Sequence, residues 1–226
     1  MDWFPIALVV LIGGGVFAAF LVSSHLENKR RERVIGLAKE LGLELNWVLP
    51  DEDRVIFHQF QVVQKGRNQK TNLSLVADDG STRINLFDYS FVTGSGKSQQ
   101  THHWVISLCR DEALQAPAMQ LKPATFFSRI GTLIGFQDVD IPDASEFSNA
   151  FVIQGKDVEG IRLFLDSSRR DALLKYPKQT YALLNQHLLI VRERKKLDAP
   201  NIKPLLSESL ALVQALSKAQ AKLCYE

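Results

Sequence analysis

Hydrophobic residues are distributed unevenly along the chain, and their first concentration lies at the N-terminus. Residues 3–22 read WFPIALVVLIGGGVFAAFLV and contain no charged side chain. A helix rises about 1.5 Å per residue, so this run would span roughly 30 Å, which is the thickness of the hydrocarbon core of a bilayer. The pattern therefore predicts a transmembrane helix, and we assign residues 1–24 as a membrane anchor.

The charges on either side of this apolar run predict its orientation. Asp2 precedes the run, and four basic residues follow it: Lys29, Arg30, Arg31 and Arg33. Because basic residues next to a membrane helix stay in the cytoplasm, we expect a single-pass protein with its N-terminus outside and its C-terminal part in the cytoplasm. A cleaved signal peptide has the opposite order of charge, although Val22-Ser23-Ser24 leaves cleavage open as an alternative.

Small residues inside the run give the predicted anchor a face for helix packing. Gly14 and Ala18 are four residues apart, and so are Gly15 and Ala19. Small residues at this spacing let two membrane helices approach closely. They favour self-association or docking on another membrane protein, and the alternative is an anchor that simply contains glycine and alanine.

The part of the chain after the anchor mixes helical and strand-like patterns. Residues 25–42 are predicted to form a basic juxtamembrane helix that ends at Gly42. Alternating residues then predict an antiparallel meander of three strands, 71–77, 83–93 and 100–108, joined by turns at 78–81 and 94–96. The other predicted elements are strands at 43–47 and 150–153, a helical turn and strand within 51–66, helices at 123–133, after Asp143, at 157–174 and at 202–221, and a hairpin of 180–184 with 187–192. Strands paired through hairpins and interleaved with helices predict an α+β domain over residues 43–226, with an antiparallel sheet packed by helices.

The overall composition narrows the classes of function. The 226 residues include 27 basic and 25 acidic side chains, which gives a net charge of +2, and 46% of them are hydrophobic. This balance argues against a nucleic-acid-binding protein, which needs an uncompensated basic surface. Two cysteines, Cys109 and Cys224, are too few for a disulfide-stapled secreted domain. We predict no cofactor.

Residues 94–98 read GSGKS and are similar to the end of a phosphate-binding P-loop. The full pattern also requires a glycine at the position of Phe91, and it requires a helix after the lysine, where residues 100–108 are strand-like. We therefore interpret the segment as a hairpin turn in which Gly94 and Gly96 adopt positive φ. The tip of this turn is a candidate ligand-binding or partner-binding site, formed by Gly94, Ser95, Gly96 and Lys97.

One aspartate and two histidines are the catalytic candidates of the chain. A tight turn at residues 94–96 would place Asp88 across the hairpin from His102 or His103, depending on the register. A carboxylate beside an imidazole orients the ring and raises its pKa, as in a catalytic triad. Ser107 and Cys109 are nearby nucleophiles, but neither lies in a recognisable nucleophile motif. The alternative is a polar pair at the surface of the sheet.

The metal-binding patterns in the sequence are incomplete, and no metal site is predicted. Asp138, Asp140 and Asp143 are closely spaced, but the glycine and the terminal glutamate of a calcium loop are missing, and Asp143 fits a helix cap. His58 and His187 are isolated and lack the spacing of zinc ligands.

Several blocks of the sequence resemble a family of uncharacterised bacterial membrane-anchored proteins. The blocks are the apolar run with its basic helix, Phe87-Asp88-Tyr89 followed by Gly94-Ser95-Gly96-Lys97 and Thr101, and Asp138-Val139-Asp140 with Glu146-Phe147. The resemblance covers most of residues 30–195, and the FDY…GSGK block is its most specific part. It implies a bacterial inner-membrane protein with one anchor and one soluble domain, and it supplies no reaction.

Three hypotheses about function follow. The first is a non-enzymatic interaction or accessory subunit of a membrane complex, bound to the lipid bilayer and to a membrane-protein partner or a second copy of itself. The second is a membrane-proximal enzyme centred on Asp88 with His102 or His103. The third is a sensor of a small anionic ligand or lipid headgroup that uses the Gly94 to Lys97 tip. A second basic cluster at residues 192–196 either contacts anionic headgroups with residues 29–33 or is a solvated loop.

Overall fold

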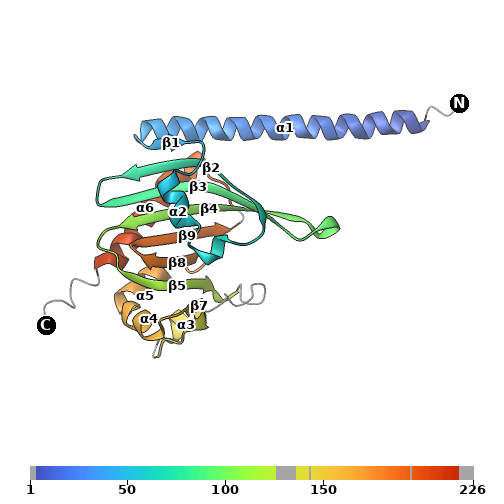
Figure 1. Ribbon diagram of the computed structural model, residues 1–226. Helices are drawn as coiled ribbons and strands as arrows, with labels where there is room; N and C mark the ends of the chain where they lie inside the picture. The colour runs from blue at the N-terminus through green and yellow to red at the C-terminus, as the bar shows by residue number, and fades with distance from the viewer. Residues whose placement is uncertain (1–3, 126–135, 143, 194, 219–226) are drawn as a thin grey trace.

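One nine-stranded sheet forms the centre of the domain, and helices cover both of its faces (Figure 1). The computed structural model describes residues 4–125, 136–142, 144–193 and 195–218, with side chains from residue 21 onward. The strand order is β1-β2-β3-β4-β9-β8-β5-β7-β6, and every neighbouring pair is antiparallel. The predicted α+β class, with an antiparallel sheet packed by helices, is confirmed.

Helix α1, Phe4–Glu40, is one continuous helix of 37 residues that runs along the edge of the sheet and extends well beyond it (Figure 1). It joins the predicted anchor and the predicted juxtamembrane helix without a break. Its C-terminal part packs on the domain through Val34 and Ala38, which are both fully buried. Among the residues whose side chains are described, no helix is long and apolar enough to cross a membrane. The predicted span lies almost entirely before residue 21, outside those residues.

The predicted meander is confirmed, and each of its strands is longer than expected. Strands β2, Arg67–Asp78, β3, Thr82–Thr93, and β4, Gln100–Asp111, pair in that order. The turn between β2 and β3 forms because Gly80 adopts a φ of 91° and the Asp79 carboxylate accepts hydrogen bonds from the backbone N–H groups of Ser81 and Thr82.

The second half of the sheet is built from strands that are distant in sequence. The predicted hairpin is confirmed as β8, Thr180–Asn185, and β9, His187–Glu193, and β9 pairs with β4. The remaining strands are β1, Glu44–Asn46, β5, Ala116–Pro123, β6, Gln137–Asp138, and β7, Phe151–Gly155.

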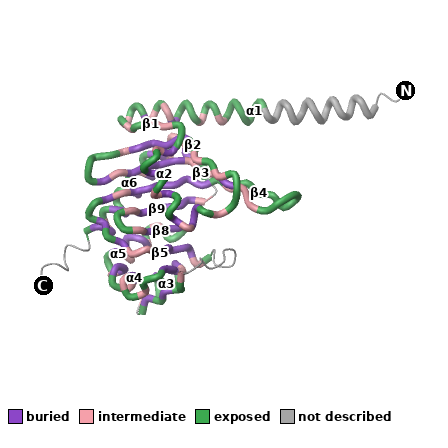
Figure 2. Tube along the Cα trace, in the orientation of Figure 1, coloured by how far each residue is buried: buried purple, intermediate pink, exposed green. Residues whose placement is uncertain are grey.

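Two hydrophobic layers lie on opposite faces of the sheet, so its central strands are buried on both sides (Figure 2). One face is covered by α2, Asp51–Phe57, and a 3-10 turn, Gln61–Val63, and it is rich in aromatic side chains. The other face is covered by α3, Ser145–Ala150, α4, Val158–Phe164, α5, Ser167–Leu174, and α6, Ala199–Lys218.

Three predicted elements differ from the structure. The strand predicted within residues 51–66 is a 3-10 turn. Pro123 ends β5 and does not begin a helix, and the rest of that predicted helix lies mostly outside the described residues. The predicted helix 157–174 is divided into α4 and α5, because Asp166 has an extended backbone and its carboxylate accepts the N–H of Arg169 as a new helix cap.

Candidate functional site

Asp88 is the predicted site residue with the most distinctive surroundings, but it does not pair with a histidine. In the register of β3 and β4, Asp88 lies opposite Val105, while His102 lies opposite Phe91 and His103 opposite Ser90. The prediction that Asp88 faces His102 or His103 across the hairpin is therefore wrong. The side chain of Asp88 is directed instead toward α1, where it contacts Arg30.

Four groups from three distant parts of the chain form what we call the α1 clamp: Glu27, Arg30, Asp88 and the backbone of Leu197. The Arg30 guanidinium donates to Asp88 Oδ2 at 3.0 Å, to Glu27 Oε1 at 2.6 Å and to the carbonyl oxygen of Leu197. The N–H of Leu197 donates to Asp88 Oδ1 at 2.7 Å. The Arg30 and Asp88 side chains are only 12% and 13% exposed. The clamp thus joins α1, the middle of β3 and the segment before α6.

Ion pairs around the clamp extend the connection between α1 and the domain. Lys196 contacts Glu27 at 3.2 Å, Arg33 contacts Asp198 at 3.2 Å, and Lys203 contacts Glu40 at 3.5 Å. These outer pairs are largely exposed, and each contributes little because water screens it. The partly buried Arg30 and Asp88 pair, together with the packing of Val34 and Ala38, therefore accounts for most of the attachment.

The two carboxylates of the clamp have pKa values shifted in opposite directions. Hydrogen bonding to Arg30, with the charges of Arg30 and Lys196, lowers the pKa of Glu27 from 4.5 to about 2, although partial burial opposes the shift. Glu27 therefore stabilises the folded state fully above its unfolded pKa of 4.5, and this contribution is lost as the pH falls toward 2. Burial raises the pKa of Asp88, while the Leu197 N–H and Arg30 oppose the shift.

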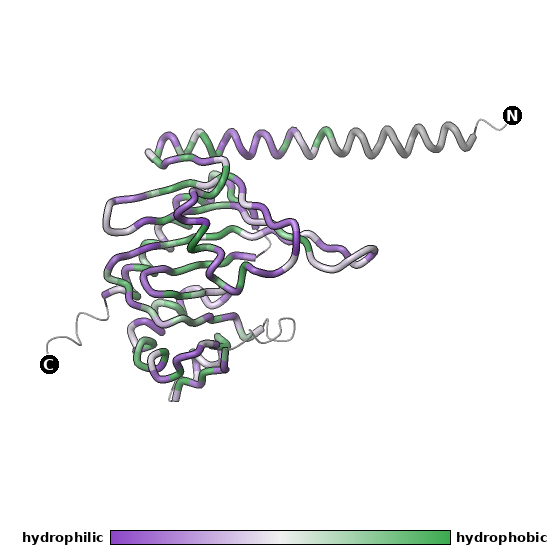
Figure 3. Tube along the Cα trace, viewed as in Figure 1, coloured by the Kyte–Doolittle hydropathy of each residue, from purple (hydrophilic) through white to green (hydrophobic). Residues whose placement is uncertain are grey.

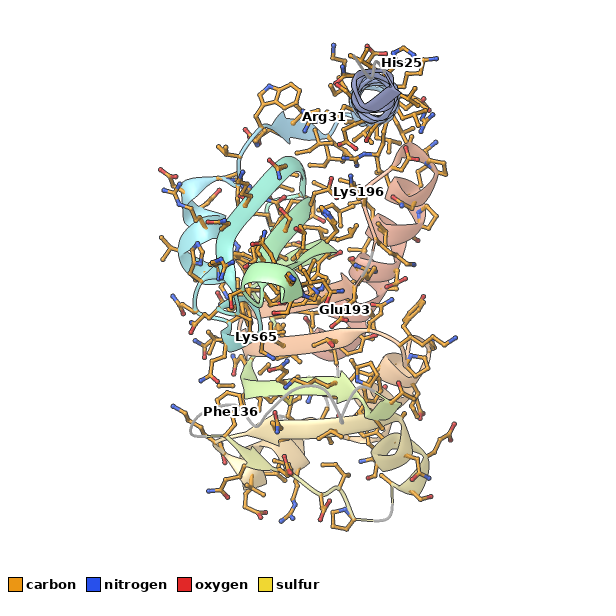
Figure 4. All side chains as sticks on the ribbon, turned by 90° about the vertical axis from the view of Figure 1, so that its right-hand side faces the viewer. His25, Arg31, Lys65, Phe136, Glu193 and Lys196 are labelled. Carbon is orange, nitrogen blue, oxygen red and sulfur yellow. The ribbon has the colours of Figure 1, made fainter. Side chains whose placement is uncertain are left out.

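A cavity of about 180 Å³ lies beside the clamp, between α1 and the β3–β4 pair. Figure 4 looks onto the end of the domain where Arg31 and Lys196, two of its lining residues, lie below and beside α1. His103 and Ser90 line the same cavity as Asp88. Three cations, Arg30, Arg31 and Lys196, line the cavity, and each of them is paired with one of its two carboxylates.

The other candidate catalytic groups are held in structural roles. His102 stacks on Phe91 with 4.8 Å between ring centroids, and its Nε2 lies 2.7 Å from Thr93 Oγ1. Ser107 is fully buried and its Oγ accepts a hydrogen bond from Arg192 at 2.8 Å. Burial raises the pKa of the Cys109 thiol to about 12, so it is protonated at neutral pH.

The Gly94 to Lys97 segment forms the exposed end of the β3–β4 hairpin, as predicted. Gly94 has a φ of 70° and Gly96 a φ of 54°. A short 3-10 turn, Gly96–Ser98, leads directly into β4. The segment is therefore a hairpin turn and lacks the helix that a P-loop places after its lysine.

The two turn glycines should respond differently to substitution. At Gly96 a Cβ would meet no atom within 4 Å, so Gly96→Ala is expected to lose about 1–2 kcal/mol of stability from the positive φ alone. At Gly94 a Cβ would lie 2.3 Å from the Ser98 carbonyl oxygen, so Gly94→Ala adds a backbone clash to the same strain. Thermal unfolding of the two variants should show the larger loss for Gly94→Ala, and equal losses would contradict this turn geometry.

Several remaining candidates are scattered or lie outside the described residues. Asp138 accepts a hydrogen bond from Gln154, while Asp143 lies outside the described residues. The small residues predicted to pack the anchor, Gly14, Gly15, Ala18 and Ala19, belong to the part of α1 whose side chains are not described.

The α1 clamp itself was not anticipated from the sequence. The sequence patterns place Arg30 in the basic cluster that orients the anchor, and Asp88 in a histidine pair. The two residues are 58 positions apart, so no local pattern links them. The signal that was present is a lone aspartate in an otherwise apolar and aromatic strand, LFDYSF, which calls for a charged partner.

Comparison with protein-family models, with curated proteins and with solved structures finds no match to this chain. The resemblance to a family of bacterial membrane-anchored proteins therefore stays a prediction, and function is argued from the geometry alone.

Proposed function

We propose that the chain is a single-pass inner-membrane protein whose domain is mounted rigidly at the cytoplasmic face of the bilayer and serves as a non-enzymatic interaction or accessory subunit of a membrane complex. The α1 clamp is the observation that carries this proposal. It fixes the helix that contains the apolar run to the middle of strand β3. A flexible tether would need no such attachment, whereas a subunit that presents a defined surface to a membrane partner does.

The hydropathy of α1 supports the position of the membrane boundary. The first described side chains, Leu21 and Val22, are hydrophobic and more than half exposed, and a long hydrophilic stretch follows toward the clamp (Figure 3). Exposed apolar side chains next to a charged stretch are typical of a helix that leaves the hydrocarbon layer. The first contacts of α1 with the domain follow about two helical turns after that boundary, at Glu27 and Arg30.

The state of the nucleophile candidates supports a non-enzymatic role. Ser107 and Cys109 are both fully buried, and Asp88 is engaged by Arg30 and Leu197. Among the described residues, these groups form no hydrogen-bonded chain of nucleophile, base and orienting acid, the arrangement that activates a serine or cysteine.

Membrane insertion and orientation are tested on the full-length chain in bacterial membranes. We expect the protein to stay in the membrane pellet after alkaline carbonate extraction, because a transmembrane helix resists it. A Gln100→Cys variant, made in a Cys224→Ser background, should react with an impermeant maleimide only after the inner membrane is opened. Release by carbonate would contradict the anchor, and labelling from the periplasmic side would contradict the orientation.

The accessory role is tested by purification in mild detergent followed by mass spectrometry of proteins bound in stoichiometric amount. We expect a membrane protein or a second copy of the chain to co-purify. A control chain in which residues 3–22 are replaced by a leucine-rich span shows whether the small residues of the anchor or the domain hold the partner. Recovery of a lone monomer from both chains would contradict the accessory role.

A second candidate function, sensing of a small anionic ligand, is favoured by the cavity beside the clamp. Its lining brings Arg31, Lys196 and His103 together. Binding of inorganic phosphate in this cavity should raise the melting temperature of the wild type and have less effect on Lys196→Ala. Equal stabilisation of both proteins would count against this candidate.

A further inference from the structure

The direction of α1 determines which end of the domain faces the bilayer. Because the clamp holds α1 against β3, the Phe4 end of the helix points away from the sheet in a fixed direction. The β3–β4 hairpin projects from the sheet in that same direction (Figure 1). If the anchor lies in the membrane, the hairpin end is therefore the part of the domain that approaches the headgroups.

The end of this hairpin extends beyond the rest of the sheet. The described pairing of β4 with β9 begins at Trp104, opposite Glu193, whereas the pairing of β4 with β3 continues out to Gln100, opposite Thr93. Residues 94–101 are all exposed. We define residues 94–99 as the hairpin tip. Because the tip projects beyond the sheet, it can contact a flat surface that the rest of the sheet does not touch.

Basic side chains predominate on the hairpin and on the segment that leads into β2. The sequence contains no aspartate or glutamate between Asp53 and Asp78, or between Asp88 and Asp111. The basic and imidazole side chains in those two segments that lie toward the hairpin end are Lys65, Arg67, Lys70, Lys97, His102 and His103. Figure 4 looks directly onto this end, where Lys65, Arg31 and Lys196 come from different elements and the acidic Glu193 lies near Lys65. The stretches 54–77 and 89–110 therefore contain no acidic residue, while the acidic Glu27 and Asp88 are paired with Arg30.

Local contacts hold the tip in a defined shape. Arg67 donates to the carbonyl oxygen of Gly94 at 2.8 Å and to Gln99 Oε1 at 3.1 Å, so it joins the two sides of the turn. The Ser98 hydroxyl donates to the carbonyl oxygen of Ser95 at 2.8 Å. With Arg67 engaged in this way, exposed Lys97 is the cation that the tip presents to its surroundings.

We propose that the hairpin tip is a second membrane contact, in which Lys97, with Lys70 behind it, binds the phosphates of anionic phospholipids in the bilayer that holds α1. This inference rests on the proposed anchor. Each basic side chain close to an anionic membrane surface strengthens binding to that surface about five-fold. The effect decays within a Debye length of the surface. Because the anchor already holds the domain at the membrane, the tip reaches the surface without the entropy cost of a separate binding event. Two lysines are therefore enough to shift the equilibrium toward the lipid-bound tip.

The contact is tested with the full-length chain in nanodiscs of phosphatidylcholine alone or with added phosphatidylglycerol. A fluorophore is attached to Gln100→Cys in a Cys224→Ser background, where buried Cys109 is unreactive. Lipids that carry a quencher at headgroup depth report proximity. We expect stronger quenching in discs with phosphatidylglycerol, and its loss at high ionic strength.

Matched variants identify the lysines responsible. Lys70→Gln with Lys97→Gln should reduce the quenching in anionic discs to the phosphatidylcholine level. Lys39→Gln with Lys218→Gln removes the same charge at the other end of the domain, and it should leave quenching unchanged. Equal quenching in both lipids, or equal loss in both double variants, would overturn the lipid contact while the anchor stands. A chain that does not elute with the nanodiscs would overturn the anchor and the contact together.

Discussion

Replacing Arg30 by methionine is expected to lower the free energy of unfolding by about 3 kcal/mol, because it leaves the Asp88 carboxylate without its cation. The Asp88 side chain is 13% exposed and would keep only the Leu197 N–H as a partner. The value is at the lower end of the range for broken buried ion pairs because both side chains retain some contact with water. For a chain of this size the melting temperature should fall by roughly 6–12 °C.

Two further variants separate the clamp from a general loss of charge. Arg33→Met removes a basic residue from the same helix, but its pair with Asp198 is exposed, so we expect a loss below about 1 kcal/mol. Asp88→Asn in the Arg30→Met background removes the unpaired charge and should recover part of the stability. Similar melting temperatures for Arg30→Met and Arg33→Met would contradict the clamp.

Replacing Glu208 by alanine is expected to lower the free energy of unfolding by about 3–5 kcal/mol. The Glu208 carboxylate on α6 accepts hydrogen bonds from Arg192 on β9 and from Gln179, and the Arg192 side chain is 3% exposed. Without Glu208 the guanidinium is buried with Ser107 as its remaining partner. Few single substitutions outside the hydrophobic core should be as damaging.

The reason for this loss is tested by removing both charges. Glu208→Ala with Arg192→Met replaces the pair by apolar side chains and should be more stable than Glu208→Ala alone. Glu159→Ala breaks an exposed pair with Arg162 and should change stability by less than about 1 kcal/mol. Chemical unfolding of the three variants measures both comparisons. A double variant that is no more stable than Glu208→Ala alone would contradict the ion-pair account.

Elements that depend on local chemistry could be predicted from the sequence. The meander follows from alternating residues and from turns that place glycine at 80, 94 and 96, where φ is positive. The hairpin around Asn185 likewise has its turn residue at a φ of 52°. The apolar stripe of α6 was visible in the spacing of its leucines.

Elements that depend on distant partners could not be predicted. Strand β5 contains two prolines and no β-branched residue, and it pairs with β7 and β8, which are separated from it in the chain. The register at Asp88 was wrong because the hairpin loop is longer than a tight turn. Pairing resumes only at Gln100, opposite Thr93, and this moves the histidines away from Asp88 and toward the tip.

The central claim is that α1 and the domain form one rigid unit, and a spin-label distance tests it most directly. Labels at Val22→Cys on α1 and Gln100→Cys on the hairpin, in a Cys224→Ser background, are measured by double electron–electron resonance in nanodiscs. The account predicts a single narrow distance distribution that broadens in Arg30→Met and stays narrow in Arg33→Met. A broad distribution with the clamp intact would contradict it, because α1 would then be a flexible tether.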